Sequence, residues 1–349
     1  MTKTAVVLYN LGGPNNLDAV RPFLFNLFND PAIIRLPTPA RWVLAKLISK
    51  RREVTAKKIY EKIGNKSPIL EETRKQAVAL QNELKVVGNF KVFVAMRYWH
   101  PFLEECLNQV QKFSPDHIVL LPLYPQFSTT TTNSFLAQWE KAIERNNLSI
   151  PTSSVCCYPS EPGFVEAVVN SVKRGLKKVE QGPQGFRVLF SAHGIPKKFV
   201  KTGDPYQLHV EQSVASIVKE LEIDGLDYVI CYQSRVGPIQ WLKPYTDQVI
   251  IKAAKEKKAL LIVPVAFVSE HSETLVELDI DYALLAKNYG APIYERVPTV
   301  GITRAYIKGL SRMVLGAKTH HRIFPYGFKR VCPKTSSGCP YTDNSRGFK

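Results

Sequence analysis

The sequence predicts an α/β protein built of two doubly wound halves, each with a parallel sheet covered by helices on both faces. Two observations lead to this fold class. Short apolar runs rich in β-branched residues alternate with helical patterns along most of the 349 residues, which is typical of parallel sheets. The first run of each half also ends in a similar phrase, VVLYNLGGP at 6–14 and VLFSAHGIP at 188–196, which indicates a weak internal repeat.

Each half contributes four predicted strands. We expect the first half to span residues 1–150 and the second 151–300. A helix over 301–317 should pack back on the first half, and a basic tail that contains cysteines follows at 318–349. A first set of strands is predicted at 4–10, 91–97, 117–124 and 153–158, and a second set at 186–191, 227–232, 259–266 and 292–297.

The first half carries an insertion between its first two strands. These strands start about 87 residues apart, against about 41 in the second half, which places the insertion within roughly 18–65. Thr38 and Pro39 are a suitable N-cap and first residue for a helix there. Apolar residues such as Trp42 and Leu47 follow, with lysines and arginines around them. Such an element suits closure over an apolar ligand, contact with a membrane surface, or ordinary core packing.

Charge and composition narrow the classes of function. The formal net charge of +17 suits nucleic acid, anionic lipid or an acidic small molecule as partner. The sequence shows no aromatic RNA-binding motif or zinc-finger spacing, so we expect no nucleic acid partner. No apolar run approaches the ~18 residues of a membrane span. The N-terminus enters a strand at once and leaves no room for a leader, so we expect a cytoplasmic protein with peripheral membrane contact at most.

Six cysteines in a chain expected in the cytoplasm argue against a disulfide framework. Cys106 and Cys231 fall within a helical and a strand pattern, where buried free thiols are the expected state. The other cysteines form two pairs along the chain, which are Cys156 with Cys157 and Cys332 with Cys339.

His193 is the candidate base, because it stands between Ala192 and Gly194 at the end of a predicted strand. In open α/β sheets, ligands bind at the carboxyl ends of the strands. The strand ends lack the dinucleotide and P-loop fingerprints, and SAHG differs from the G-x-S-x-G elbow of hydrolases. A histidine at such an exit can project into a cleft and accept a proton near neutral pH.

Residues 267–282, FVSEHSETLVELDIDY, gather five carboxylates and a histidine in a chain that is otherwise basic. An α-helix there would place one acid about every ~5.4 Å turn on one face. Like charges at this spacing repel, so stability alone would not select the pattern; the alternative is a solvated helix face. The acids on the expected face are Glu270, Glu273, Glu277 and Asp281.

Glu273 is the carboxylate that we expect to face His193. Such a pair supplies a proton acceptor together with a carboxylate that receives or relays the proton. The same nitrogen and oxygen donors also suit a divalent first-row metal, so the residues alone leave both roles open.

Taken together, these residues resemble the ferrochelatase family over about residues 3–315. The resemblance implies a lyase whose substrates are ferrous iron and protoporphyrin IX, and which releases two protons in the last step of haem synthesis. It also implies two Rossmann-like halves of the chelatase type, with an N-terminal lip over the porphyrin cleft where the insertion lies. The matching phrases, in the family's order, are LYNLGGP, FLFNLFND, SKRR, IGNKSPI, RYWHPF, LYPQFSTTTT, SAHGIP, GDPY, YQSRVGP, WLKP and SEHSETLVELD.

The resemblance also implies roles for single residues. His193 is similar to the family's active-site histidine, which accepts pyrrole protons or ligates the metal, and Glu273 to its catalytic partner. Glu270, His271 and Glu277 match an acidic conduit for metal or protons. The substrate-binding residues that the resemblance implies are Leu11, Arg52, Tyr98, Tyr124, Tyr232 and Trp241.

Some members of the family hold a 2Fe–2S cluster through C-terminal cysteines and an internal one. Tyr341 stands where a further tail thiol would complete that pattern. Four thiolates are still available for such a cluster. Adjacent cysteines at a strand end are expected to point to opposite faces, which would strain their joint ligation. The four candidate ligands are Cys156, Cys157, Cys332 and Cys339.

Two rival functions stay open from the sequence. One is a chelatase for another tetrapyrrole or metal, such as coproporphyrin with iron or sirohydrochlorin with cobalt; the apolar lip favours protoporphyrin. The other is a non-catalytic haem- or metal-binding protein, which gives no reason for a row of carboxylates behind a base. The sequence indicates no oligomeric state, and we expect any membrane contact to be made through the lip at the inner membrane surface.

Overall fold

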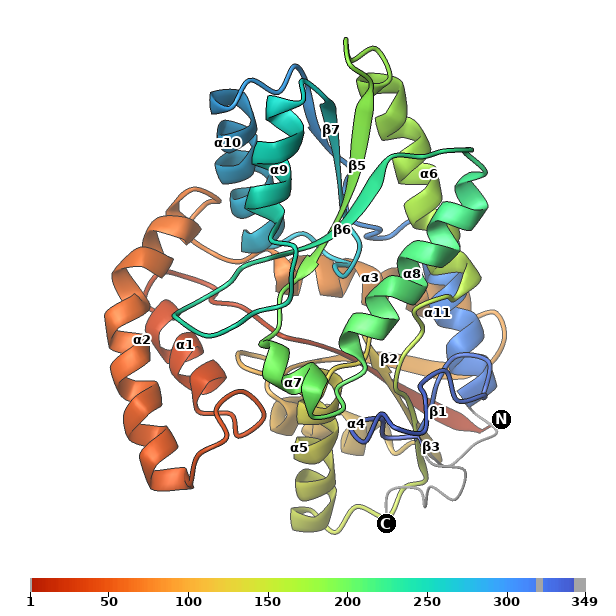
Figure 1. Ribbon diagram of the computed structural model, residues 1–349. Coiled ribbons are helices and arrows are strands. Elements are labelled where there is room, and N and C mark those ends of the chain that lie inside the picture. The colour runs from red at the N-terminus through yellow and green to blue at the C-terminus, as the bar shows by residue number, and fades with distance from the viewer. Residues whose placement is uncertain (1, 318–322, 342–349) are drawn as a thin grey trace. The chain divides into compact units, whose positions relative to one another are not determined.

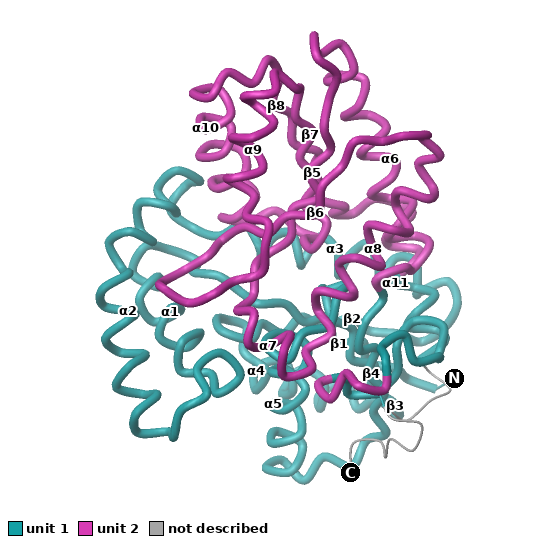
Figure 2. Tube along the Cα trace, viewed as in Figure 1, with its two compact units in different colours: residues 1–158, 310–333, 339–349 teal, residues 159–309, 334–338 magenta. Residues whose placement is uncertain are grey.

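The structure, a computed structural model, describes residues 2–317 and 323–341. The chain divides into two compact units, shown in teal and magenta in Figure 2. The main boundary follows Tyr158, whereas the sequence led us to expect it after Ile150. Unit 1 comprises residues 1–158, 310–333 and 339–349, and unit 2 comprises residues 159–309 and 334–338.

Unit 1 is built on a sheet that, within the described residues, has five parallel strands in the order β2-β1-β3-β4-β9. The central strands are buried on both faces, which is why they read as continuous apolar runs. Four strands match predicted ones, while β9 has only two residues and shows no pattern to predict. The strands are β1 (Lys3–Asn10), β2 (Asn89–Met96), β3 (His117–Pro122), β4 (Thr152–Val155) and β9 (Ile323–Phe324).

The helices of unit 1 include the expected insertion. Its two helices, α1 and α2, lie between β1 and β2. Helix α2 begins at Thr38 itself, so Thr38 is its first helical residue rather than its N-cap. Leu107 of α4 and Trp139 of α5 share one buried cluster with Val7 of β1. The helices are α1 (Val20–Phe28), α2 (Thr38–Glu61), α3 (Ile69–Leu84), α4 (Leu103–Phe113) and α5 (Thr132–Arg145).

Unit 2 is built on a parallel sheet with the order β6-β5-β7-β8. Figure 1 shows α9 and α10 on one side of this sheet and α6 and α8 on the other, as doubly wound folds require. The strands are β5 (Phe186–His193), β6 (Tyr228–Gln233), β7 (Ala259–Pro264) and β8 (Tyr294–Arg296). The helices are α6 (Pro162–Val179), α7 (Lys197–Lys201), α8 (Tyr206–Leu221), α9 (Thr246–Lys255), α10 (Tyr282–Asn288) and α11 (Arg304–Ala317). Helix α11 begins in unit 2 and continues into unit 1 at Leu310.

The two sheets share one connectivity. In each, the first strand lies between the second and the third, and the fourth follows the third. Both halves are therefore doubly wound α/β folds, and the repeat inferred from LYNLGGP and SAHGIP corresponds to equivalent strand exits. In such sheets the order of strands reverses beside the first strand, and ligands bind at the carboxyl ends there. His193 ends the first strand of unit 2.

The acidic stretch differs from the predicted α-helix. Residues Glu273–Asp281 form a π-helix, η1, and α10 continues it. Hydrogen bonds in a π-helix run from i to i+5, so a turn holds more residues and acids four apart stay on one side. Glu270 lies before η1 and does not join that face. The row of four acids expected from the sequence is therefore a row of three, Glu273, Glu277 and Asp281.

Within the described residues, no helix is both long and apolar enough to cross a lipid bilayer. Part of the predicted basic tail, residues 318–322 and 342–349, lies outside the described residues.

Candidate functional site

His193, the last residue of β5, is held in place by its neighbours. The N–H of Gly194 donates to the carbonyl oxygen of Gln233 at the end of β6 (2.9 Å). A Cβ at residue 194 would also lie 2.9 Å from that oxygen, so the close approach requires glycine. The hydroxyl of Tyr206 donates to the His193 carbonyl (2.9 Å). About 39% of the His193 side chain is exposed, so the fixed imidazole stays accessible.

Glu273 in η1 is the partner of this imidazole. Its Oε2 atom lies 2.7 Å from Nδ1 of His193. Burial disfavours the charged imidazolium, but the charge and hydrogen bond of Glu273, with the charge of Glu277, outweigh burial and raise the pKa of His193. Burial likewise opposes ionisation of Glu273, but His193 and His271 hold the pKa of this carboxyl well below its usual range. Among the described residues, Nε2 of His193 has no hydrogen-bond partner, so it can accept a proton.

His271 lies on another side of the Glu273 carboxylate. Its Nε2 atom is 3.8 Å from Oε2 of Glu273, and its Nδ1 atom is 3.2 Å from the carbonyl oxygen of Ser269. The side chain is buried and packs against the ring of Phe267. His271 thus helps to lower the pKa of the Glu273 carboxyl.

Glu277, one step further along η1, is surrounded by hydrogen-bond donors. Ser234 donates its N–H to Oε1 (2.9 Å) and its hydroxyl to Oε2. Gln233 donates from Nε2 to Oε2 (3.0 Å), and Tyr282 donates its hydroxyl to Oε1 (2.9 Å). We did not select Gln233 or Ser234 from the sequence, although the phrase YQSRVGP places both at the exit of β6.

Glu270 belongs to a different group. Its Oε1 atom lies 2.7 Å from Nη1 of Arg296 and accepts the N–H of Thr299 (2.9 Å). Arg296 also pairs with Asp279. Burial would raise the pKa of Glu270, but Arg296 and these hydrogen bonds lower it overall. The ion pair with Arg296 neutralises Glu270, and no hydrogen bond described here joins it to Glu273.

Three of the predicted substrate residues of unit 1 lie at one apolar cluster. Leu11 and Tyr98 pack into it together with Phe28. The guanidinium of Arg52 lies 5.8 Å from the ring centre of Phe28, and burial lowers the pKa of Arg52. Tyr98 is 1% exposed and donates its hydroxyl to Asp30 (2.7 Å), so it supports the cluster from inside.

Tyr124, the other predicted residue in unit 1, packs elsewhere. It contacts the buried cluster beneath β1, and its ring centre is 6.4 Å from that of Tyr9. In unit 2, Trp241 lies beside the strand exit that carries His193, because a Cβ on Gly194 would be 3.5 Å from its ring. Tyr232 is buried at the end of β6.

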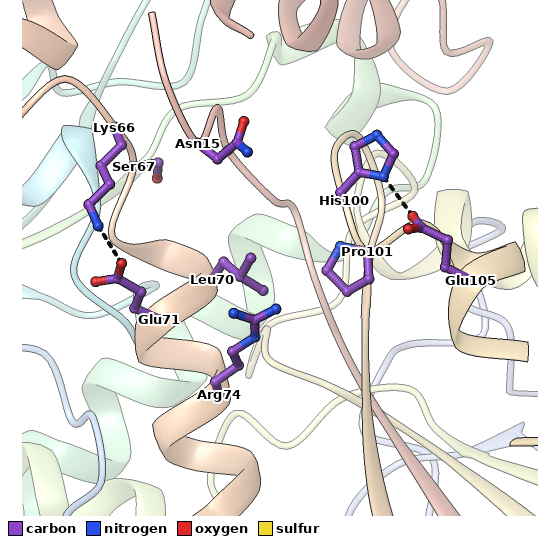
Figure 3. Close-up of a pocket in the computed structure, with 10 residues that line it drawn as sticks. Asn15, Lys66, Ser67, Leu70, Glu71, Arg74, His100, Pro101 and Glu105 are labelled. Carbon is purple, nitrogen blue, oxygen red and sulfur yellow. Dashed lines mark hydrogen bonds and ion pairs between the residues drawn. The ribbon is translucent and has the colours of Figure 1, made fainter. Parts of the chain in front are cut away.

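A cavity of about 190 Å³ in unit 2 is lined by Ser234, Glu277 and Tyr282 among others. A cavity of about 370 Å³ in unit 1 is shown in Figure 3. Two ion pairs line it, Lys66 with Glu71 and His100 with Glu105, and none of the predicted site residues does.

The four candidate cluster ligands all belong to unit 1. The Sγ atoms of Cys156 and Cys157 are 3.5 Å apart, so the expectation of opposite directions was wrong. Strand β4 ends at Val155, and side-chain alternation does not apply beyond it. A hydrogen bond with Cys332 outweighs burial and lowers the pKa of Cys339 to about 6. The charges of Cys332 and Cys339 also act on Cys157, whose pKa is raised first by its hydrogen bond with Cys156 and by burial.

Within the described part of the chain, no three His, Cys, Asp or Glu side chains are grouped so as to hold a single metal ion. The thiols are grouped in twos instead, and the histidine and carboxylate beside η1 form a pair. The cysteines predicted as buried free thiols, Cys106 and Cys231, are buried and unbonded to another cysteine.

Comparison with known proteins identifies the family. The chain is 44% identical over 344 residues to the ferrochelatase of Pelagibacter ubique, covering 97% of this chain and 98% of that protein. It is 47% identical to the ferrochelatase of Rickettsia bellii, covering 97% and 94%. The sirohydrochlorin chelatase SirB of Bacillus subtilis, solved with cobalt, shares the fold with a TM-score of 0.52 and 14% identity, over 91% of this chain and 97% of that chain. Residues 3–318 match the family model described as Ferrochelatase, and this chain therefore belongs to the ferrochelatase family.

Proposed function

We propose that this chain inserts ferrous iron into protoporphyrin IX to give protohaem, that His193 is the base which takes the pyrrole protons, and that Glu273 is its partner. Family membership over nearly the whole chain supports the reaction. The contact of 2.7 Å between Nδ1 of His193 and Oε2 of Glu273 carries the assignment of the residues. Iron and porphyrin are both substrates, and protohaem and two protons are the products.

The chemistry of the porphyrin explains why such a pair is needed. A flat free-base porphyrin holds two inward N–H groups that obstruct the metal. Buckling the ring exposes a nitrogen lone pair and costs about 1–5 kcal/mol of strain. Apolar contacts elsewhere on the porphyrin offset this strain. Nε2 of His193 then accepts a pyrrole proton, and the carboxylate of Glu273 stabilises the imidazolium that forms. The raised pKa of His193 makes this transfer favourable near neutral pH.

The reaction is tested by anaerobic incubation of the protein with ferrous iron and a porphyrin, following the loss of porphyrin fluorescence. We expect turnover with protoporphyrin to exceed that with coproporphyrin at equal concentration. Faster turnover with coproporphyrin would change the assigned substrate. Binding of porphyrin without metallation by folded protein would favour a non-catalytic binding protein.

The lip residues of α2 also suit a peripheral membrane contact on the cytoplasmic side. Val43 and Leu47, one turn apart on this helix, are 52% and 61% exposed, and Trp42 beside them is 46% exposed. Lysines and arginines border this face and would meet anionic lipid headgroups.

We expect Leu47→Glu to abolish sedimentation of the protein with vesicles containing about one-third anionic lipid, because a carboxylate there repels the headgroups and resists burial. Val78→Glu is the matched control, since Val78 is 62% exposed on α3, outside the lip. Equal sedimentation of both variants with the wild type would contradict the contact.

Four of the five cysteines of unit 1 suit a 2Fe–2S cluster. Cys156 with Cys157 and Cys332 with Cys339 would supply two pairs of thiolates, the number that all-thiolate ligation needs. The lowered pKa of Cys339 means that one of these thiols ionises near neutral pH, as a ligand must. A bound cluster would supply a one-electron centre.

We expect protein purified anaerobically to show visible charge-transfer absorption and stoichiometric sulfide, and Cys156→Ser to lose both. Cys106→Ser should keep both, because Cys106 is buried in α4 and packs in a separate cluster of unit 1. If Cys156→Ser retains the cluster while Cys332→Ser loses it, Cys156 is not a ligand.

A further inference from the structure

Ser234 lies between the two carboxylates of η1. Its hydroxyl oxygen is 3.4 Å from Oε2 of Glu273 and donates a hydrogen bond to Oε2 of Glu277. Because a hydroxyl carries one proton and two lone pairs, it can receive a proton from one side as it donates its own to the other. These contacts complete an unbroken path from the imidazole of His193 through Glu273 and Ser234 to Glu277.

The backbone at Ser234 is held in an unusual conformation. Its φ angle is +64°, in the left-handed region that residues with a side chain rarely occupy. Such a conformation persists only where the surroundings enforce it. Here the N–H and the hydroxyl of Ser234 both bond to Glu277, so the strained turn after β6 aims the hydroxyl at η1.

Glu277 is suited to protons rather than iron. Its two oxygens accept four hydrogen bonds, from the Ser234 N–H, the Ser234 hydroxyl, Gln233 and Tyr282. A carboxylate offers about four lone-pair sites, and a metal ion needs some of them free. Glu277 also lines the cavity of about 190 Å³ in unit 2, which is large enough for several water molecules.

We propose that Ser234 relays protons from Glu273 to Glu277, and that the protons displaced by iron leave through the cavity beside Glu277. This inference rests on the proposed function and deepens it. His193 accepts a pyrrole proton at Nε2 and gives up the one at Nδ1 to Glu273. Glu273 then protonates Ser234 Oγ as the Ser234 hydroxyl passes its own proton to Glu277, which releases it to water.

The path returns to its starting state after each passage. Rotation of the Ser234 hydroxyl restores its hydrogen bond to Glu277, and exchange of protons with water returns the imidazole of His193 to the tautomer that carries its proton at Nδ1. Two passages per iron account for the two protons of the reaction. Ser234 is a relay, and its own charge does not change.

The test compares Ser234→Ala and Ser234→Asn with the wild type in the anaerobic assay, in H₂O and D₂O. Asparagine tolerates a positive φ and can still donate to Glu277, but it cannot pass a proton on. We expect both variants to lower kcat by roughly 10²-fold, the lower end of what a positioned proton-transfer group contributes, with KM for iron and porphyrin unchanged. The solvent isotope effect on kcat should increase in both.

Ser216→Ala is the control, since Ser216 lies on α8 and its hydroxyl donates to Ser160, away from the carboxylates of η1. A wild-type kcat in Ser234→Asn would overturn the relay, because it would show that a hydrogen-bond donor to Glu277 is enough for full turnover. An unchanged kcat in Ser234→Ala, or a raised KM for iron alone, would also overturn it. If the wild type itself fails to metallate porphyrin, the proposed function fails, whereas normal wild-type turnover with these outcomes rejects only the relay.

Discussion

Replacing His193 with alanine is expected to lower kcat by roughly 10²- to 10⁴-fold, the contribution of a positioned general base. The variant lacks the imidazole of His193. In the proposed pair this is the group that accepts a pyrrole proton, while the carboxylate of Glu273 stays ionised. Porphyrin affinity should stay within about twofold, because the apolar contacts that bind the macrocycle are unchanged. Turnover is measured by loss of porphyrin fluorescence with ferrous iron under anaerobic conditions, and binding by fluorescence without iron.

His100→Ala is the matched control for this experiment. His100 is an exposed histidine of unit 1 that also pairs with a glutamate, at 2.7 Å from Glu105. Its removal should leave kcat unchanged. If His193→Ala turns over at the wild-type rate, the base is another group. If it instead loses porphyrin binding with kcat retained, His193 positions the substrate and does not take its protons.

The strands that carry the site were predictable because their signals are local. The run ALLIVP in β7 is buried at every position, so all of its residues are apolar and no partner is needed to recognise it. The pairing of His193 with Glu273 was predictable for a related reason. Both follow strand exits of one parallel sheet, and such exits meet at one edge.

Other features depend on contacts that a sequence does not display. Strand β9 exists only because Phe324 can pair with Val155, more than a hundred residues away. The π-helix was missed because its apolar positions, such as Leu278, also fit an α-helical period. Ser234 was missed because a serine in a turn has no distinctive pattern. Its role follows from a backbone angle and two hydrogen bonds that appear only when β6 lies beside η1.

Glu273→Gln should shift the acid limb of the pH–rate profile to lower pH and reduce the maximal rate by about 10²-fold. The base must be neutral to accept a proton, so activity falls as pH drops through the pKa of His193. In the wild type that pKa is raised, because the charge and hydrogen bond of Glu273 outweigh burial. A neutral amide at position 273 removes this charge, burial then dominates, and the pKa of His193 falls below its ordinary value.

The size of the shift separates the effects of the two carboxylates on His193. The charge of Glu277 also raises the pKa of His193, but less than that of Glu273, so Glu277→Gln should move the acid limb the same way by a smaller amount. Glu105→Gln, which removes the partner of His100 in unit 1, should leave the limb in place. An acid limb that moves to higher pH in Glu273→Gln would mean that it reports ionisation of a carboxylate, and His193 would then not be the titrating base.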